Sequence, residues 1–427
     1  MIDLRTEVTK GPDMFRLRGV VVAIALTFSV GALTPLAHAV ASGPTTPPAR
    51  EGMGMAYDAA RSEVVLFGGI DSTGTTLGDT WTWDATTWTQ EHPATSPPAR
   101  YAMGMTYDAA RGDVVLFGGY SLYFGDTWTW DGTTWTHRHP AKSPPARDYL
   151  GMTYDAARSE VVLFGGYHSG RLGDTWTWDG STWTPRHPAT SPSARDSMGM
   201  AFDAARGDVV LFGGHASGTC CNQADTWTWD GTTWTQQHPA TSPPGRGLIG
   251  MTYDADHSGV VVFGGRSHTH DFDDTWTWDG TTWTQQHSAT SPSDRESMGM
   301  TYDAARGEVV VFGGENLDRS YFADTWTWDG TTWRVPFVAH LHLSPDSGPP
   351  GTVVQVTGTG FAAFESVTLT FVDPVAGKSG LGTFATDATG AFAAQVTVPS
   401  NSSVGARKIT AVGAVSGQKT KATFTVT

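Results

Sequence analysis

The feature that most constrains this chain is an internal repeat of about fifty residues. The tripeptide Phe-Gly-Gly occurs six times, at intervals of 50, 47, 48, 51 and 49 residues, beginning at Phe67, Phe117, Phe164, Phe212, Phe263 and Phe312. All 18 tryptophans fall in these units, three in each. A repeat of this length is typical of β-propeller blades, each of which must pack on its neighbours to bury its faces.

The second unit shows how one repeat is built. Its segment 103–107 alternates apolar and small or polar residues, and 114–117 is a continuous apolar run. These patterns predict a strand buried on one face and then a strand buried on both. Asp-Thr-Trp-Thr-Trp at 126–130 predicts a third strand. The Asp-Gly turn at 131–132 leads into a fourth around 134–136.

Every unit contains all four predicted strands in order, from Met53 to Trp88 in the first and from Met298 to Trp333 in the last. We therefore expect no strand to be exchanged between the ends of the ring. The ring would close by side-chain packing between blades one and six. The sequence predicts an all-β fold with a six-bladed propeller over residues 47–336.

The double glycine after an apolar strand, followed by Asp-Thr-Trp and a spaced tryptophan, resembles the kelch repeat in all six units. The resemblance implies a kelch-type propeller. It implies little about activity, because kelch propellers serve as peptide-binding adaptors, actin binders and oxidase scaffolds.

A second domain is expected over residues 340–427, where the tryptophans stop. Short alternating segments such as 351–358, 392–399 and 422–426 are separated by Gly-, Pro- and Asp-rich turns. This pattern is typical of a small β-sandwich. Ser-Pro-Asp-Ser-Gly-Pro-Pro-Gly and Gly-Thr-Gly-Phe resemble immunoglobulin-like IPT/TIG or related bacterial surface modules, which implies a spacer or adhesion role.

The N-terminal 39 residues carry the pattern of an export signal. Arg16 and Arg18 precede an apolar run over 20–33, and Ala-His-Ala at 37–39 is typical of a cleavage site. We therefore expect a protein that is secreted or held at the cell surface after cleavage near Ala39. A retained N-terminal membrane anchor is the alternative.

The charge and the scarcity of lysine exclude some classes of partner. The formal net charge is −15, which argues against nucleic-acid binding, and there is no polybasic patch for a membrane surface. We expect a monomer without a cofactor, whose partner is an extracellular protein or glycan.

One candidate site is an arginine directly before the first strand of each unit: Arg50, Arg100, Arg147, Arg195, Arg246 and Arg295. In kelch domains that bind acidic peptides, arginines at the matching position contact carboxylates. The resemblance thus implies that six guanidinium groups ring one mouth of the channel, where each could bind a carboxylate through two hydrogen bonds. The alternative is that each arginine pairs with a nearby aspartate or loop carbonyl.

The other candidate site is the loop after Gly-Gly, where the six units differ. Its candidate binding residues are Tyr120, Tyr123, Tyr167, His168, His215, Arg266, His268, Glu315 and Tyr321. Variation confined to one face of a constant scaffold is what a binding surface would show, although unconstrained drift would look the same.

No catalytic or metal-binding residues stand out from the repeats. The aspartate before each Thr-Trp is expected to cap loop amides rather than bind metal: Asp79, Asp126, Asp174, Asp225, Asp274 and Asp324. Cys220 and Cys221 are adjacent and would form either a strained disulfide or a reduced pair. We expect a recognition scaffold for a protein or glycan rather than an enzyme. The alternative is a secreted carbohydrate-active enzyme, either galactose-oxidase-like or sialidase-like.

Overall fold

The computed structural model describes residues 46–216, 222–336, 339–361, 365–387, 390–414 and 419–427. These residues form strands, turns and loops, and none of them belongs to a helix that could cross a membrane. The expected export signal and the cysteine pair lie outside the described residues.

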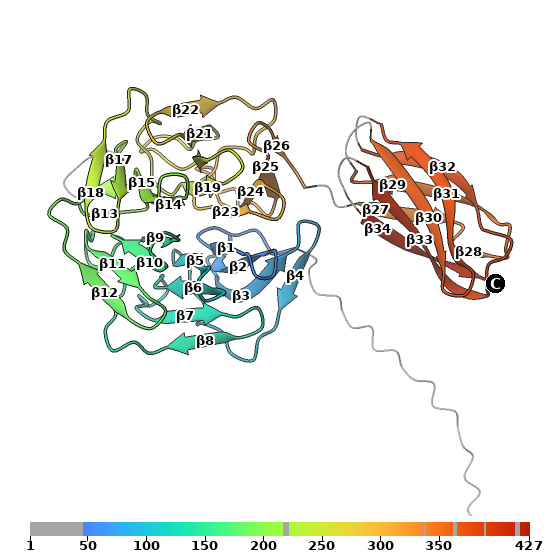
Figure 1. Cartoon of the computed structure of the whole chain (residues 1–427), viewed down its shortest axis with the longest axis horizontal. Helices are drawn as coiled ribbons and strands as arrows, with labels where there is room; N and C mark the ends of the chain where they lie inside the picture. Colours follow the sequence, from blue (N-terminus) through green and yellow to red (C-terminus); the bar gives the residue numbers. More distant parts are fainter. Residues whose placement is uncertain (1–45, 217–221, 337–338, 362–364, 388–389, 415–418) are drawn as a thin grey trace, which may run out of the picture. The chain divides into compact units, whose positions relative to one another are not determined.

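Each repeat forms one four-stranded antiparallel sheet, and the first strand of each sheet faces the centre of the ring (Figure 1). Blade one contains β1 (Gly54–Asp58), β2 (Glu63–Ile70), β3 (Thr76–Trp83) and β4 (Trp88–Glu91). Blade two contains β5 (Gly104–Asp108), β6 (Asp113–Phe117), β7 (Thr127–Trp130) and β8 (Trp135–Arg138). Blade three contains β9 (Gly151–Asp155), β10 (Glu160–Phe164), β11 (Thr175–Trp178) and β12 (Trp183–Arg186).

The remaining three blades repeat this order. Blade four contains β14 (Gly199–Asp203), β15 (Asp208–Phe212), β17 (Thr226–Trp229) and β18 (Trp234–Gln237), with β13 (Arg195–Asp196) and β16 (His215–Ala216) paired beside it. Blade five contains β19 (Gly250–Asp254), β20 (Gly259–Phe263), β21 (Thr275–Trp278) and β22 (Trp283–Gln286). Blade six contains β23 (Gly299–Asp303), β24 (Glu308–Phe312), β25 (Thr325–Trp328) and β26 (Trp333–Arg334). The predicted six-bladed all-β propeller is confirmed.

The blades are joined by the third tryptophan of each repeat. Trp135 of blade two is fully buried, and its ring centroid lies 5.3 Å from that of Phe67 in blade one. Its indole N–H donates to Thr80 Oγ1 of blade one at 2.9 Å. Trp88 makes the corresponding contacts across the closure, with Phe312 and Thr325 of blade six. The ring closes without strand exchange, as the repeat predicts, and hydrogen bonds as well as packing hold the closure.

Around the axis of the propeller, methionines of the first strands pack against the neighbouring blade. Adjacent first strands approach closely because glycine stands between the methionines. A Cβ added at Gly54 would lie 2.8 Å from the sulfur of Met105 in the next blade. Methionine suits these positions because its flexible, unbranched side chain adapts to irregular gaps between strands.

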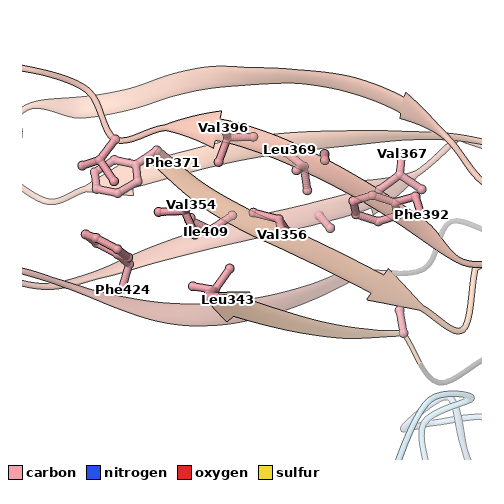
Figure 2. Packing of buried hydrophobic residues seen from close by; sticks show 14 of the residues in the cluster. Leu343, Val354, Val356, Val367, Leu369, Phe371, Phe392, Val396, Ile409 and Phe424 are labelled. Carbon is pink, nitrogen blue, oxygen red and sulfur yellow. The ribbon is translucent and has the colours of Figure 1, made fainter. Parts of the chain in front are cut away.

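The C-terminal residues form a two-sheet sandwich. One sheet contains β27 (His340–Ser344), β29 (Val353–Thr359) and β32 (Phe392–Thr397). The other contains β28 (Ser347–Gly348), β34 (Lys419–Val426), β33 (Gly405–Gly413), β30 (Ser366–Asp373) and β31 (Gly377–Ala385), in that spatial order. Figure 2 shows the alternate residues that meet between them, among them Val356, Leu369, Ile409 and Phe424, which are fully buried.

Candidate functional site

A closed ring of backbone hydrogen bonds surrounds the channel at one mouth of the propeller. Its members are the second residues after the six arginines, and each donates its N–H to the carbonyl of its counterpart in the neighbouring blade at 2.7–2.9 Å. All six have left-handed φ angles between +48° and +63°: Gly52, Ala102, Tyr149, Ser197, Leu248 and Ser297. This ring holds residues of five different types in six equivalent positions around the axis.

The first residue after each arginine pairs with the residue after Gly-Gly in the same blade. The pairs are Glu51–Ile70, Tyr101–Tyr120, Asp148–Tyr167, Asp196–His215, Gly247–Arg266 and Glu296–Glu315. Three varying positions of each repeat therefore meet at this mouth. The other mouth is lined by alanines and by tyrosine or phenylalanine from every blade, so its surface is repetitive.

On one side of the varied mouth lies a pocket of about 410 Å³ that we call the tyrosine pocket. It is lined by Tyr101, Tyr120, Tyr123, Asp148, Tyr149, Tyr167, Asp196, Ser197, His215 and Leu248. Several of its rings meet edge to face. The interplanar angle is 70° for Tyr101–Tyr120 and 84° for Tyr120–Tyr123, with centroids 5.4 and 4.8 Å apart. The rings therefore stand as walls rather than as a flat platform.

The two aspartates of the tyrosine pocket differ in their partners. Asp196 accepts from Ser197 Oγ at 2.9 Å, lies 3.0 Å from His215 Nδ1 and forms an ion pair with Arg171 at 2.8 Å. Asp148 is 4% exposed, and its Oδ1 has no hydrogen-bond partner in the described structure. Burial, and secondarily the charge of Asp196, raises the pKa of Asp148 to about 6.

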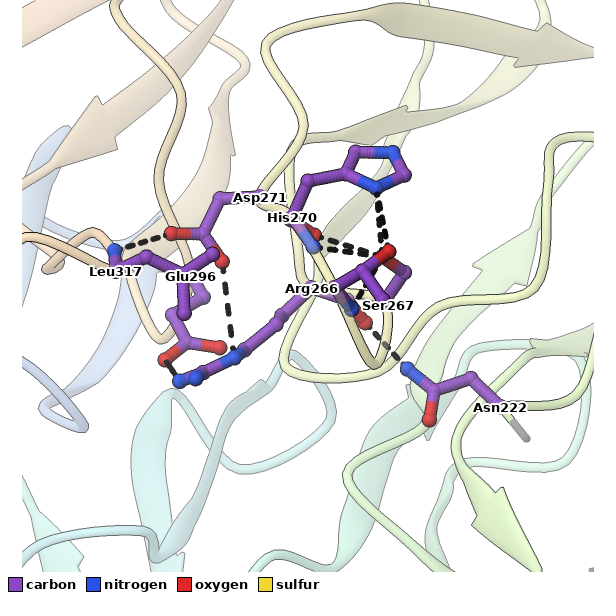
Figure 3. Close-up of polar contacts among 8 residues, drawn as sticks. Asn222, Arg266, Ser267, His270, Asp271, Glu296 and Leu317 are labelled. Atoms are coloured by element: carbon purple, nitrogen blue, oxygen red, sulfur yellow. Dashed lines mark hydrogen bonds and ion pairs between the residues drawn. The ribbon is translucent and has the colours of Figure 1, made fainter. Parts of the chain in front are cut away.

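An acidic cluster lies at the same mouth, in blades five, six and one. Figure 3 shows its members Arg266, Asp271 and Glu296. Arg266 donates to Glu296 Oε1 at 2.7 Å, and Asp271 accepts from the Leu317 amide. Burial raises the pKa of Glu296 to about 7, although Arg266 opposes the shift. Burial and then the charges of Glu315 and Glu296 raise the pKa of Glu51 to about 7. This mouth is therefore acidic and carries one arginine within the cluster.

The raised pKa of Glu51 predicts a pH-dependent stability. A glutamate whose native pKa exceeds its ordinary value of 4.5 binds its proton more tightly in the native state. The free energy of unfolding must then fall as pH rises from about 4.5 to about 7. We expect Glu51→Gln to match the wild type at pH 4.5 and to be more stable at pH 8, by on the order of 1–3 kcal/mol.

Denaturant unfolding at both pH values measures this difference. Glu91→Gln, on outer strand β4, is the control and should change stability by less than about 0.5 kcal/mol at either pH. An equal gain at pH 4.5 and pH 8 for Glu51→Gln would contradict the proposed burial of charge.

The prediction that the six arginines line the mouth is wrong. Each is at most 1% exposed and forms a bidentate pair with the aspartate before the Thr-Trp of its own repeat. In blade two, Arg100 Nη1 and Nη2 donate to the carboxylate of Asp126 at 2.6 and 2.9 Å, and Nη1 also reaches the Gly118 carbonyl. The alternative interpretation, pairing with a nearby aspartate and a loop carbonyl, describes all six. The guanidinium groups anchor the loops and cannot contact a ligand.

The aspartates also differ from their predicted role. Asp126 accepts from Arg100 and from the indole N–H of Trp128 at 2.7 Å, so the predicted amide cap is instead an anchor for two side chains. Burial raises the pKa of Asp126, but the hydrogen bond and charge of Arg100 outweigh it, and the net pKa is lowered.

The loop residues are only partly brought together. Tyr120, Tyr123, Tyr167 and His215 line the tyrosine pocket. His168 packs on Tyr123, with ring centroids 4.7 Å apart. Arg266, Glu315 and Tyr321 belong to the acidic cluster. His268 is exposed and does not line the tyrosine pocket.

Sequence reasoning missed the pocket residues that directly follow the arginines. Tyr101, Asp148, Tyr149 and Asp196 are the main ones. A signal was present: the two residues after each arginine read Glu-Gly, Tyr-Ala, Asp-Tyr, Asp-Ser, Gly-Leu and Glu-Ser, between an invariant arginine and a recurring apolar-Gly pair. Variation at these positions is as marked as in the loops.

Metal-centred chemistry has no matching arrangement in the described part of the chain. No group of three or more His, Cys, Asp or Glu side chains there is placed to hold a metal ion. His268, His270 and Asp271, which lie within four residues of one another in sequence, do not form such a group.

Comparison with known proteins agrees with the architecture. Residues 133–284 match the model of the KLHDC2/KLHL20/DRC7 kelch-repeats domain. The matched part of the propeller therefore consists of kelch repeats. The remaining blades carry the same motif on both sides of the matched segment. Residues 338–426 match the macroglobulin-like domain, which confirms the predicted immunoglobulin-like class of the C-terminal sandwich.

No curated protein matches the kelch propeller chain in sequence. Among solved structures, it is similar to a fungal alcohol oxidase of the AA5 family in complex with copper. The identity is 15% and the TM-score 0.46, over 90% of this chain and 99% of the oxidase.

Proposed function

We propose that the protein is a secreted or cell-surface recognition scaffold that binds a protein or glycan ligand at the varied mouth of its propeller. The observation that carries the proposal is the tyrosine pocket. Five tyrosines and two aspartates, none of which recurs as a set in other blades, converge there on a concave surface. An aromatic concavity with a few placed polar groups is the usual form of a ligand site.

The contrast between the two mouths supports this proposal. The opposite mouth repeats the same residue types from blade to blade, as packing and ring geometry require. The varied mouth is built on equally regular backbone, with six bridges and six ring hydrogen bonds. The side chains at the varied mouth therefore differ from blade to blade although the backbone is the same in each. A rigid backbone that carries different side chains is typical of a specific binding surface.

A glycan array and a peptide array probed with the purified propeller protein test the proposal. Tyr167 is 37% exposed at the pocket rim, so Tyr167→Ala removes a contact surface without opening the core. We expect this variant to lose binding to each array ligand by about tenfold or more, the loss typical of a removed aromatic anchor.

Leu122→Ala is the matched control because Leu122 lies in the corresponding loop of the preceding blade, is 84% exposed and does not line the pocket. It should retain wild-type binding. Equal binding by Tyr167→Ala and the wild type, or no array ligand at all, would contradict recognition at this mouth. If the protein converted a bound glycan to products, it would be a carbohydrate-active enzyme, and the proposed recognition role would be wrong.

A further inference from the structure

The carboxylates around the varied mouth differ in whether the protein supplies them with a cation. Four repeats carry a carboxylate directly after the arginine: Glu51, Asp148, Asp196 and Glu296. Glu51 accepts a hydrogen bond from the Tyr321 hydroxyl at 3.5 Å. Asp196 pairs with Arg171 at 2.8 Å, and Glu296 pairs with Arg266 at 2.7 Å. In the described structure, Asp148 has neither an ion pair nor a hydrogen bond to its Oδ1, although it is nearly fully buried.

The reason for the difference lies in the preceding loop. Arg171, which pairs with Asp196, stands just before the residue whose carbonyl accepts the amide of Arg195. The residue at the same place one blade earlier is Tyr123, which precedes the acceptor of the Arg147 amide. A tyrosine ring therefore replaces the guanidinium group beside Asp148, and both residues line the tyrosine pocket.

The surroundings of Asp148 indicate which kind of ligand group could supply the missing positive charge. A buried carboxylate oxygen without a hydrogen-bond partner is costly, and an ionised carboxylate can only accept hydrogen bonds. A pKa near 6 leaves Asp148 mostly ionised at neutral pH. The tyrosine rings around it stand at steep angles to one another, so the pocket presents ring faces and edges from several directions. Ring faces are electronegative and attract cations, most strongly where water is excluded.

We infer that the tyrosine pocket binds an organic cation, an ammonium or guanidinium group of the ligand, with Asp148 as its counter-ion and the tyrosine rings as its walls. This inference rests on the proposed recognition role of the same pocket and names the chemistry of its ligand. A basic side chain of a protein and a quaternary ammonium headgroup share this chemistry. The net charge of −15 and the neighbouring acidic cluster favour the approach of either.

Titration calorimetry on the whole chain tests the inference with paired probes. Choline is compared with 3,3-dimethylbutan-1-ol, its neutral isostere, and lysine amide and arginine amide are compared with citrulline amide. We expect at least one cation to bind ten or more times tighter than its neutral counterpart. Preference for choline would indicate a headgroup, and preference for lysine or arginine amide would indicate a basic side chain.

Two variants locate the effect. Asp148→Asn keeps the shape of the side chain and should weaken binding of the cation about tenfold or more. Tyr123→Arg places a guanidinium group where blade three has Arg171, and it should abolish binding by supplying Asp148 with an internal partner. Asp318→Asn, at an exposed position of the blade six loop, removes the same charge and should change affinity less than about twofold.

The inference is overturned if choline and its isostere bind equally, if no cation binds, or if Asp148→Asn binds as tightly as the wild type. Its failure is distinguishable from failure of the proposed function. A neutral array ligand that is lost in Tyr167→Ala would leave recognition at this mouth standing without a cation.

Discussion

Asp126→Ala is expected to lower the free energy of unfolding by about 3–5 kcal/mol. The substitution leaves Arg100 fully buried without its bidentate carboxylate partner, and the guanidinium group keeps only carbonyl acceptors. It also removes the acceptor of the Trp128 indole N–H. Breaking a buried pair by removing one partner is costly because the remaining charge cannot be solvated.

Chemical denaturation of the variant and of Asp113→Ala measures this effect. Asp113 pairs with Arg138, which is 41% exposed, at 3.6 Å, so its removal should cost no more than about 1 kcal/mol. If the two variants were destabilised equally, the buried pairs would contribute no more than surface pairs. The arginines would then need another explanation for their presence in every repeat.

Trp88→Ala is expected to destabilise the propeller by about 3–5 kcal/mol, the cost of emptying a large buried site. Trp88 is 5% exposed, its ring centroid lies 5.1 Å from that of Phe312, and its indole N–H donates to Thr325 Oγ1 at 3.0 Å. These contacts cross the closure between blades one and six, where no short crossover segment joins the two sheets.

Trp135→Ala is the matched control, because Trp135 makes the same contacts between blades one and two, which the chain connects directly. Both variants should lose similar global stability. Hydrogen exchange should separate them: Trp88→Ala should expose β1–β4 and β23–β26 to local opening, and Trp135→Ala should not. Equal protection of these strands in the two variants would show that closure is not a weak point of the ring.

Most of the propeller follows from local patterns. The apolar run 114–117 predicted a strand covered on both faces, and the structure buries all four of its residues almost completely. The tryptophan spacing predicted blades because three large rings per repeat need neighbouring blades to cover them. Such patterns are predictable because strand periodicity and burial act within a few residues of sequence.

Patterns within a few residues of sequence do not decide the role of the arginines. Arg100 and Asp126 are 26 residues apart, and the pair forms only because the blade folds the start of one repeat against its own third strand. A recurring arginine is compatible with an exposed ring of charges or with six buried ion pairs. Only the burial of the side chain distinguishes the two, and burial is a property of the assembled ring.

The tyrosine pocket depends still more on assembly. Tyr101 and Tyr120 meet across one repeat, whereas Asp148, Asp196 and His215 come from the next two. In sequence these residues look like unrelated differences between units. The closed ring of backbone hydrogen bonds places them around one mouth, and this ring involves residues as distant as Gly52 and Ser297.

The repeat, the six blades, their strand order and the separate C-terminal sandwich were all predictable from the amino-acid sequence. They depend on periodicity, turn chemistry and hydrophobic burial along short segments. The tertiary structure alone decided which polar residues are buried and which varied residues face one another. Those outcomes depend on contacts between blades, where an arginine can be neutralised by its own repeat and an aspartate can be left without a cation.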